Sequence, residues 1–178
     1  MKTINFQINN HETRNLEIIC SCIDISNIEK YLKRVGEVEN KEKVKISFVP
    51  NKYIYSLPHL LFAMYITEAK FIDNLNVSNN FSTEMLLTLS CSDQIKKIHP
   101  EIYLKEGNNK NIFVLVLSEK IISNKILETI KKELNIKEEK ENKVIKFNIK
   151  DTLDYYKIKE PNAEDKIIEK MALSAIDK

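Results

Sequence analysis

The chain has 178 residues, of which 43% are hydrophobic and 30% are charged, and its formal net charge is +2. This length suits one domain with a substantial core, and the mixed charge indicates no strong preference for nucleic acid or for a membrane. The only two glycines, Gly36 and Gly107, exclude a phosphate-binding glycine loop or a dinucleotide fingerprint, because both need several closely spaced glycines.

The composition predicts a cytoplasmic protein without metal or cofactor. The amino terminus is polar rather than a secretory signal, and the apolar run from Leu60 to Ile66 is far shorter than the roughly 20 residues that span a bilayer. An odd number of cysteines (Cys20, Cys22 and Cys91) suits a reducing compartment better than a disulfide framework. Buried structural cysteines are favoured over a zinc site because there is no Cys-x-x-Cys pair.

The first fifty residues predict two strands, a helix and a third strand. Alternation of apolar and polar residues identifies the first strand, and a more continuous apolar run identifies the second. Asp24 or Ser26 is a candidate cap for the helix, and Gly36 is its expected stop. The four elements cover residues 4–8, 16–25, 27–35 and 44–49.

Residues from about 58 to 98 predict a helical block. Pro58 suits the first turn of a helix, and the dense apolar residues after it indicate that this helix is buried. A second helix begins around Ser82, with Glu84 near the positive end of its dipole. Ser90 and Asp93 have the spacing of a capping box and predict a third helix.

The rest of the chain mixes strands and helices. A six-residue hydrophobic run is the best candidate for a strand buried on both faces, and a serine-capped helix follows it. A charged loop, a short strand, a short helix and a terminal helix come next. These segments cover residues 112–117, 123–134, 137–143, 144–149, 151–158 and about 161–177. Because the elements do not alternate regularly, we predict an α+β (mixed α/β) fold with a mostly antiparallel or mixed sheet, in one domain over residues 1–178.

One part of the helical block resembles a known family. A helix rich in His, Ala and aliphatic residues leads through Asn74-Leu75-Asn76-Val77 into Phe81-Ser82-Thr83-Glu84-Met85-Leu86-Leu87-Thr88-Leu89-Ser90, and Gln94-Ile95 follows. This order of segments resembles the family of the PRPK-binding protein, the KEOPS subunit that docks on a small atypical kinase, in its archaeal type. Asn74 and Cys91 stand where the family usually has Gly, and Asn tolerates a left-handed conformation better than most residues.

The resemblance implies a function in which this chain is not the catalyst. Such a protein binds the small KEOPS kinase and supports the complex that places a threonylcarbamoyl group on the adenosine beside the anticodon. Archaeal relatives also bind tRNA through its single-stranded CCA end. The expected partners are therefore the kinase and tRNA, with no membrane contact and no cofactor, and the chain is expected to be a monomer when alone.

The Asn-rich turn before the second helix is the candidate RNA contact. Its amides offer donors and acceptors to the bases or sugars of a single-stranded end, and lysines nearby could meet phosphates. A polar connection between helices explains the turn as well, and a packed structural role is the plainer interpretation of the histidine in the preceding helix. The candidate residues are His59, Lys70, Asn74, Asn76, Asn79, Asn80, Lys96 and Lys97.

The terminal helix is the candidate kinase contact. Its apolar residues recur at i, i+3, i+4 and i+7, and the small residues among them would let another helix approach closely. A helix that only completes the core explains the same pattern. The candidate docking residues are Ile168, Met171, Ala172 and Ala175.

A small-molecule enzyme is an alternative from another class, and a stand-alone RNA-binding module is a third possibility. Asp151 and Asp154 lie three residues apart, while Glu160, Glu164 and Asp165 cluster near the start of the terminal helix. Paired acids transfer protons usefully only where burial separates their pKa values. These acids lie in polar surroundings, where capping and helix-dipole roles explain them better.

Overall fold

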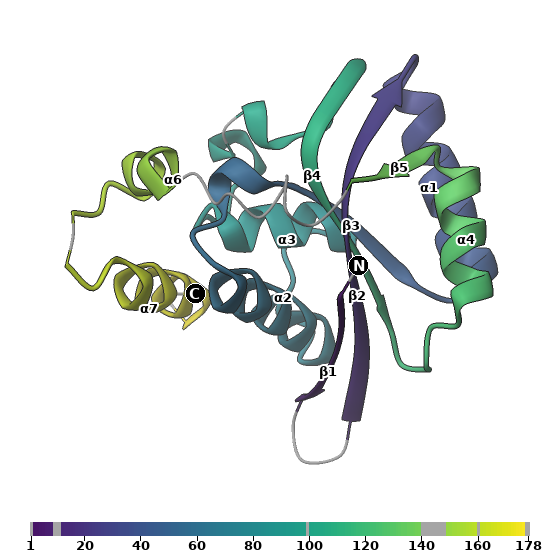
Figure 1. The fold of residues 1–178 in the computed structure, drawn as a ribbon. Helices are drawn as coiled ribbons and strands as arrows, with labels where there is room; N and C mark the ends of the chain where they lie inside the picture. The colour runs from purple at the N-terminus through teal and green to yellow at the C-terminus, as the bar shows by residue number, and fades with distance from the viewer. Residues whose placement is uncertain (1, 9–11, 99, 140–148, 160, 177–178) are drawn as a thin grey trace. The chain divides into compact units, whose positions relative to one another are not determined.

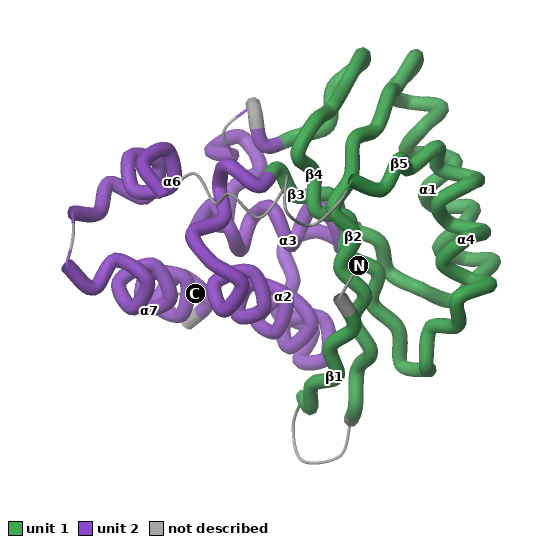
Figure 2. Tube along the Cα trace, viewed as in Figure 1, with its two compact units in different colours: residues 1–50, 103–145 green, residues 51–102, 146–178 purple. Residues whose placement is uncertain are grey.

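The computed structural model describes residues 2–8, 12–98, 100–139, 149–159 and 161–176. The chain divides into two compact units, each assembled from two segments: residues 1–50 with 103–145, and residues 51–102 with 146–178 (Figure 2). Helices and antiparallel strands together give an α+β architecture, which confirms the expected fold class. The expectation of a single domain stays a prediction.

The first unit contains an antiparallel sheet. Its strands are β1 Lys2–Ile8, β2 Glu12–Ile25, β3 Lys45–Pro50, β4 Gly107–Ser118 and β5 Ile136–Glu138. The strand order is β1-β2-β4-β3, and β5 pairs with the end of β2 on the same side as β1 (Figure 1). Every pairing among these strands is antiparallel. The apolar run predicted as a buried strand, residues 112–117, is buried throughout within β4.

Two helices pack on one face of this sheet: α1 Ile28–Glu42 and α4 Asn124–Glu133 (Figure 1). Their apolar stripes, with Val35 and Val38 from α1 and Leu127 and Ile130 from α4, form one core with the Ile and Val side chains of β2, β3 and β4. Ser123 caps α4, as the sequence predicts. The apolar residues that alternate along the strands and those that recur at the helical period in α1 and α4 therefore pack against each other in one core.

The predicted start of α1 is within one residue of the observed one, but its predicted cap and its predicted stop are wrong. Asn27 is the cap, because its side chain accepts a hydrogen bond from the backbone N–H of Lys30 at 2.9 Å. The helix continues through Gly36 and ends at Lys43, whose backbone is left-handed with φ 58°. A glycine inside a helix costs only about 1 kcal/mol, and burial of Val38 in the next turn offsets that cost.

The second unit is helical, with α2 Leu57–Ile72, α3 Phe81–Leu89, α6 Ile149–Tyr156 and α7 Ala163–Ile176. Pro58 lies in the first turn of α2, as the sequence predicts, and the side chain of Ser56 caps this helix. α2 packs against both α3 and α7 (Figure 1). Within the described ranges, no helix combines the length and the apolar character needed to cross a membrane.

The capping box predicted at Ser90 and Asp93 is wrong, because Ser90 ends α3 instead of opening a helix. Cys91 adopts a left-handed backbone with φ 46°, and its N–H donates to the Thr88 carbonyl at 3.1 Å. The N–H of Ser92 donates to the Leu87 carbonyl at 3.1 Å, which completes a Schellman ending. Two short 3-10 turns, Ile95–Lys97 and Pro100–Ile102, follow in place of the predicted helix.

Three further predictions concern the segment after α4. Residues 137–143 were predicted as a charged loop, but Lys137 and Glu138 belong to β5 and pair with β2. The strand predicted over 144–149 lies mostly outside the described residues, and Ile149 is the first residue of α6. The predicted short helix of residues 151–158 corresponds to α6.

Candidate functional site

The connection between α2 and α3, residues 73–80, is the predicted Asn-rich turn and is called the Asn turn from here on. It begins with a second Schellman ending, in which Asn74 is left-handed with φ 56°. The N–H of Asn74 donates to the Phe71 carbonyl at 3.4 Å, and the N–H of Leu75 donates to the Lys70 carbonyl at 2.8 Å. Asn74 and Cys91 therefore occupy equivalent left-handed positions at the ends of consecutive helices, where glycine would have no Cβ penalty.

The four candidate asparagines of the Asn turn divide into two kinds. Asn76 donates from its side-chain amide to the Ser78 carbonyl at 3.1 Å, and the Asn80 side chain caps α3 by accepting from the backbone N–H of Thr83 at 2.9 Å. These two side chains build the turn, as the polar-connection interpretation expects. Asn74 and Asn79 are exposed, so they are the two whose amides are best placed to meet a ligand.

Two apolar side chains also project from the Asn turn. Leu75 is 50% exposed and Val77 is 46% exposed. The accessible surface of the turn therefore combines amide groups with aliphatic groups. Such a mixture can hydrogen-bond to the edge of an unstacked base and also contact its face.

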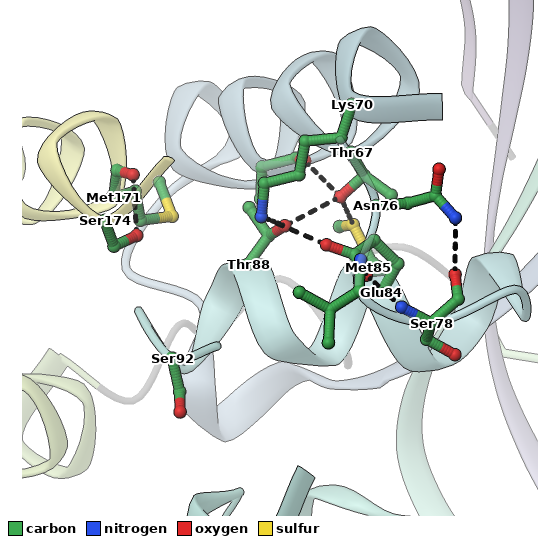
Figure 3. Close-up of polar contacts among 12 residues, drawn as sticks. Thr67, Lys70, Asn76, Ser78, Glu84, Met85, Thr88, Ser92, Met171 and Ser174 are labelled. Atoms are coloured by element: carbon green, nitrogen blue, oxygen red, sulfur yellow. Dashed lines mark hydrogen bonds and ion pairs between the residues drawn. The ribbon is translucent and has the colours of Figure 1, made fainter. Parts of the chain in front are cut away.

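The carboxylate of Glu84 fixes the backbone of the Asn turn, and this side chain is 0% exposed. Its Oε2 accepts hydrogen bonds from the backbone N–H groups of Val77 and Ser78, both at 2.8 Å (Figure 3). Its Oε1 accepts from Lys70 Nζ at 3.1 Å, and Lys70 Nζ also donates to Thr88 Oγ1 at 3.2 Å. One buried acid thus connects α2, α3 and the turn between them.

From the sequence, Glu84 is predicted only as an acid near the start of a helix. A signal for its real role was present, since Lys70 and Glu84 each lie on a helix that is otherwise dense in apolar residues. A charged group that is buried with such a helix has to be paired and hydrogen-bonded. Lys70 and Glu84 are therefore expected to pair with each other.

This pairing argues against Lys70 as a direct RNA contact. Its side chain is buried and its ammonium group is occupied by Glu84 and Thr88 (Figure 3). In this arrangement Lys70 neutralises Glu84, and a phosphate outside the protein does not reach it. Its contribution to any RNA contact would be indirect, through the shape of the Asn turn.

His59 is also buried, with 0% exposure. Its Nδ1 accepts from the backbone N–H of Tyr55 at 3.0 Å, and its Nε2 lies 3.2 Å from the hydroxyl oxygen of Tyr156. Because the Tyr156 hydroxyl donates to the Leu89 carbonyl, its oxygen is left to accept, which assigns the imidazole proton to Nε2. Burial lowers the pKa of His59 to about 4, so the ring is neutral at pH 7. These bonds join the start of α2 to α6 and to the end of α3.

The two other candidate lysines, Lys96 and Lys97, are exposed on the 3-10 turn beyond α3. The Asn turn precedes α3 and these lysines follow it, and Figure 3 shows Ser78 and Ser92 at opposite ends of this helix. The nine residues of α3 have a length of roughly 13 Å. The structure therefore does not group the lysines directly with the turn, and a ligand that met both would extend over several nucleotides.

The predicted docking stripe of α7 is partly buried. Met171 is completely buried, next to Ile167 on the face that completes the core of the second unit. Ile168, Ala172 and Ala175 are half-exposed along the border of that face. Leu173 is 52% exposed on a different side of the helix. The core interpretation therefore accounts for Met171, whereas docking through Ile168, Ala172 and Ala175 stays a prediction.

The acidic residues considered for catalysis do not form a buried pair among the described residues. Asp151 and Asp154 are exposed on α6, and Glu160 lies outside the described residues. Glu164 accepts a hydrogen bond from the hydroxyl of Ser56, which ties the start of α7 to the start of α2.

The described part of the chain brings no three His, Cys, Asp or Glu side chains together as metal ligands. None of the three cysteines, all of which the structure describes, forms a disulfide. Burial raises the pKa of Cys91 to about 11, so that thiol is protonated at neutral pH and is a poor nucleophile or ligand.

Comparison with known proteins identifies the family. A search of curated proteins finds no match for the chain. The family model described as kinase binding protein CGI-121 matches residues 23–177, which include the Asn turn, α7 and most of both compact units. This match confirms the resemblance to the PRPK-binding protein family that the helical block indicates. The chain therefore belongs to the family of the kinase binding protein CGI-121.

Proposed function

We propose that this chain is a non-catalytic subunit of a KEOPS-type complex. It binds the small kinase, supports its activity and helps to recruit tRNA for threonylcarbamoyl-adenosine modification. The observation that carries the proposal is the family match over residues 23–177, because a kinase partner is what defines that family. ATP and metal chemistry would belong to the partners, and this chain would contribute position.

For the kinase contact we propose the half-exposed stripe of α7, formed by Ile168, Ala172 and Ala175. Two of these side chains are small, which lets a partner helix approach closely, and Ile168 adds apolar area to the stripe. Met171 supports the stripe from the core and does not itself need to reach the kinase.

For the tRNA contact we propose the Asn turn, with Asn74 and Asn79 as direct contacts and Asn76 and Asn80 as the residues that shape it. A single-stranded end such as CCA offers unpaired base edges that amide side chains can read. Lys96 and Lys97 would meet backbone phosphates further along the strand. His59 and Lys70 are buried and would support the surface without touching RNA.

Size-exclusion chromatography of this chain mixed with the small KEOPS kinase of the same organism tests the kinase contact. Co-elution as a stoichiometric complex is the expected result. Separate elution of two folded proteins would contradict the proposal and leave RNA binding as the function to pursue.

A binding assay with intact tRNA and with the same tRNA lacking its 3′ CCA tests the RNA contact. Weaker binding of the shortened tRNA is expected. Equal binding of both, falling steeply with salt, would indicate only a general attraction to phosphates.

A further inference from the structure

We propose that Glu84 is a positioning residue for RNA: its buried carboxylate holds the Asn turn in the one conformation that presents Asn74 and Asn79. This inference rests on the proposed function, since it takes the Asn turn to be the RNA contact. It adds a residue that lies behind the contact surface and does not touch the ligand.

Glu84 anchors the centre of the Asn turn through its backbone. A single oxygen of Glu84 accepts from two consecutive backbone N–H groups, those of Val77 and Ser78, each at 2.8 Å. Two bonds to adjacent peptide groups restrict the backbone orientation at the centre of the turn, whereas one bond would leave it free to rotate. The side chain of Asn76 then closes on the Ser78 carbonyl and locks the same segment from the other side (Figure 3).

Both ends of the Asn turn are fixed as well. Lys70, which pairs with Glu84, belongs to the last turn of α2, and Glu84 belongs to the first turn of α3. The Schellman ending at Asn74 fixes the start of the turn, and the Asn80 cap fixes its end. The Glu84 anchor supplies the remaining fixed point in the middle.

A fixed backbone in the Asn turn favours RNA binding. Asn74, Leu75, Val77 and Asn79 have exposed side chains on a turn whose backbone is fixed before any ligand arrives. A surface that is ordered in advance avoids the entropy cost of ordering on binding. Without the anchor, the same side chains would bind the same RNA more weakly because each binding event would have to order the turn.

A matched pair of double variants separates positioning from stability. Lys70→Met/Glu84→Gln and Lys70→Met/Glu84→Met both remove the buried ion pair and keep similar side-chain volumes. Only the first keeps an oxygen that can accept from Val77 and Ser78. Each full-length variant is tested for co-elution with the kinase, for affinity to intact tRNA, and for hydrogen exchange at the amides of Val77 and Ser78.

The expected result is that both variants co-elute with the kinase, while only the Met/Met variant binds tRNA about tenfold more weakly. The Val77 and Ser78 amides should exchange faster in that variant alone. Equal tRNA affinity of the two variants would overturn the proposal. Parallel loss of kinase and tRNA binding in the Met/Met variant would also overturn it, because Glu84 would then act on the whole fold.

A failure of the underlying RNA contact would look different. Asn74→Ala and Asn79→Ala in the otherwise natural chain would leave tRNA affinity unchanged, which contradicts the Asn turn as the contact. The exchange rates of Val77 and Ser78 would still report whether Glu84 fixes the turn. The two failures are therefore distinguishable.

Discussion

Burial sets the protonation state of His59. Both of its ring nitrogens are engaged inside the second unit, and a proton added to Nδ1 would face the Tyr55 N–H, another donor. Burial, which disfavours the charged imidazolium, lowers the pKa of His59 to about 4. For this side chain the structure therefore favours a structural role over direct contact with RNA.

The pH dependence of stability tests this description of His59. Above pH 6.5 His59 is neutral in both the folded and the unfolded chain, and its contribution to stability is fully present. Between pH 6.5 and about 4 only the unfolded chain binds the proton, so the free energy of unfolding should fall by up to about 1.4 kcal/mol per pH unit.

Urea unfolding of the wild type and of His59→Gln across this range provides the measurement, because the carboxylates titrate in both proteins and cancel. The difference between the two should shrink as the pH falls. Parallel curves, or an NMR titration that places the pKa of His59 near 6.5, would contradict the prediction.

The buried pair of Lys70 and Glu84 gives a second prediction at the scale of single residues. Lys70→Met alone should destabilise the protein by about 3–5 kcal/mol, because Glu84 is left buried without its cation. Adding Glu84→Met should recover part of this loss, because no buried charge is left unpaired, although the N–H groups of Val77 and Ser78 lose their acceptor. A double-mutant cycle by urea unfolding gives the coupling energy, and additive losses would show that the two charges are solvated independently.

At the scale of elements, the sequence was informative wherever the signal was local. Pro58 marks the start of α2, Ser123 marks the start of α4, and an unbroken apolar run marks the centre of β4. Helix ends were less predictable, because the same residue type can begin a helix, end it or lie inside it. Gly36 resembles a stop but lies inside α1, and Ser90 resembles a cap but ends α3.

The candidate site shows the same division between local and distant information. The Asn turn could be located from its composition and from the family resemblance. The buried state of Lys70 and His59 could not be located in this way, because it depends on partners from other segments: Glu84 and Thr88 for the lysine, and Tyr156 for the histidine. Exposure is a property of the packed unit, and neither spacing nor residue type reports it directly.

Gly36→Ala tests the corrected course of α1. The residue lies inside the helix, its φ is not positive, and a Cβ built there meets nothing within 4 Å. Alanine should therefore raise the free energy of unfolding by about 0.5–1 kcal/mol through its better helix propensity. If Gly36 were instead a left-handed stop, the same substitution would destabilise the protein. Thermal or urea unfolding distinguishes the two by the sign of the change.

At the scale of the whole molecule, the proposed kinase and RNA contacts both belong to the second unit but use different elements of it. In Figure 3, Met171 and Ser174 of α7 lie well apart from Asn76 and Ser78 of the Asn turn. Deleting α7 would not test the kinase contact cleanly, because Ile167 and Met171 are fully buried and their loss would open the core. Single substitutions on the surface of α7 are the better probe.

Ala172→Glu should weaken kinase binding at least about tenfold, because a charged side chain on the half-exposed stripe would have to be buried without a partner. Leu173→Glu is the matched control, since the same charge is placed one residue further along, on a side of the helix that the proposal leaves free. Both variants should keep the tRNA affinity of the wild type, because the Asn turn is unchanged. Isothermal titration with the kinase and with tRNA measures the two affinities separately. If Leu173→Glu weakens kinase binding and Ala172→Glu does not, the kinase docks on the other side of α7; if neither does, the docking surface lies outside this helix.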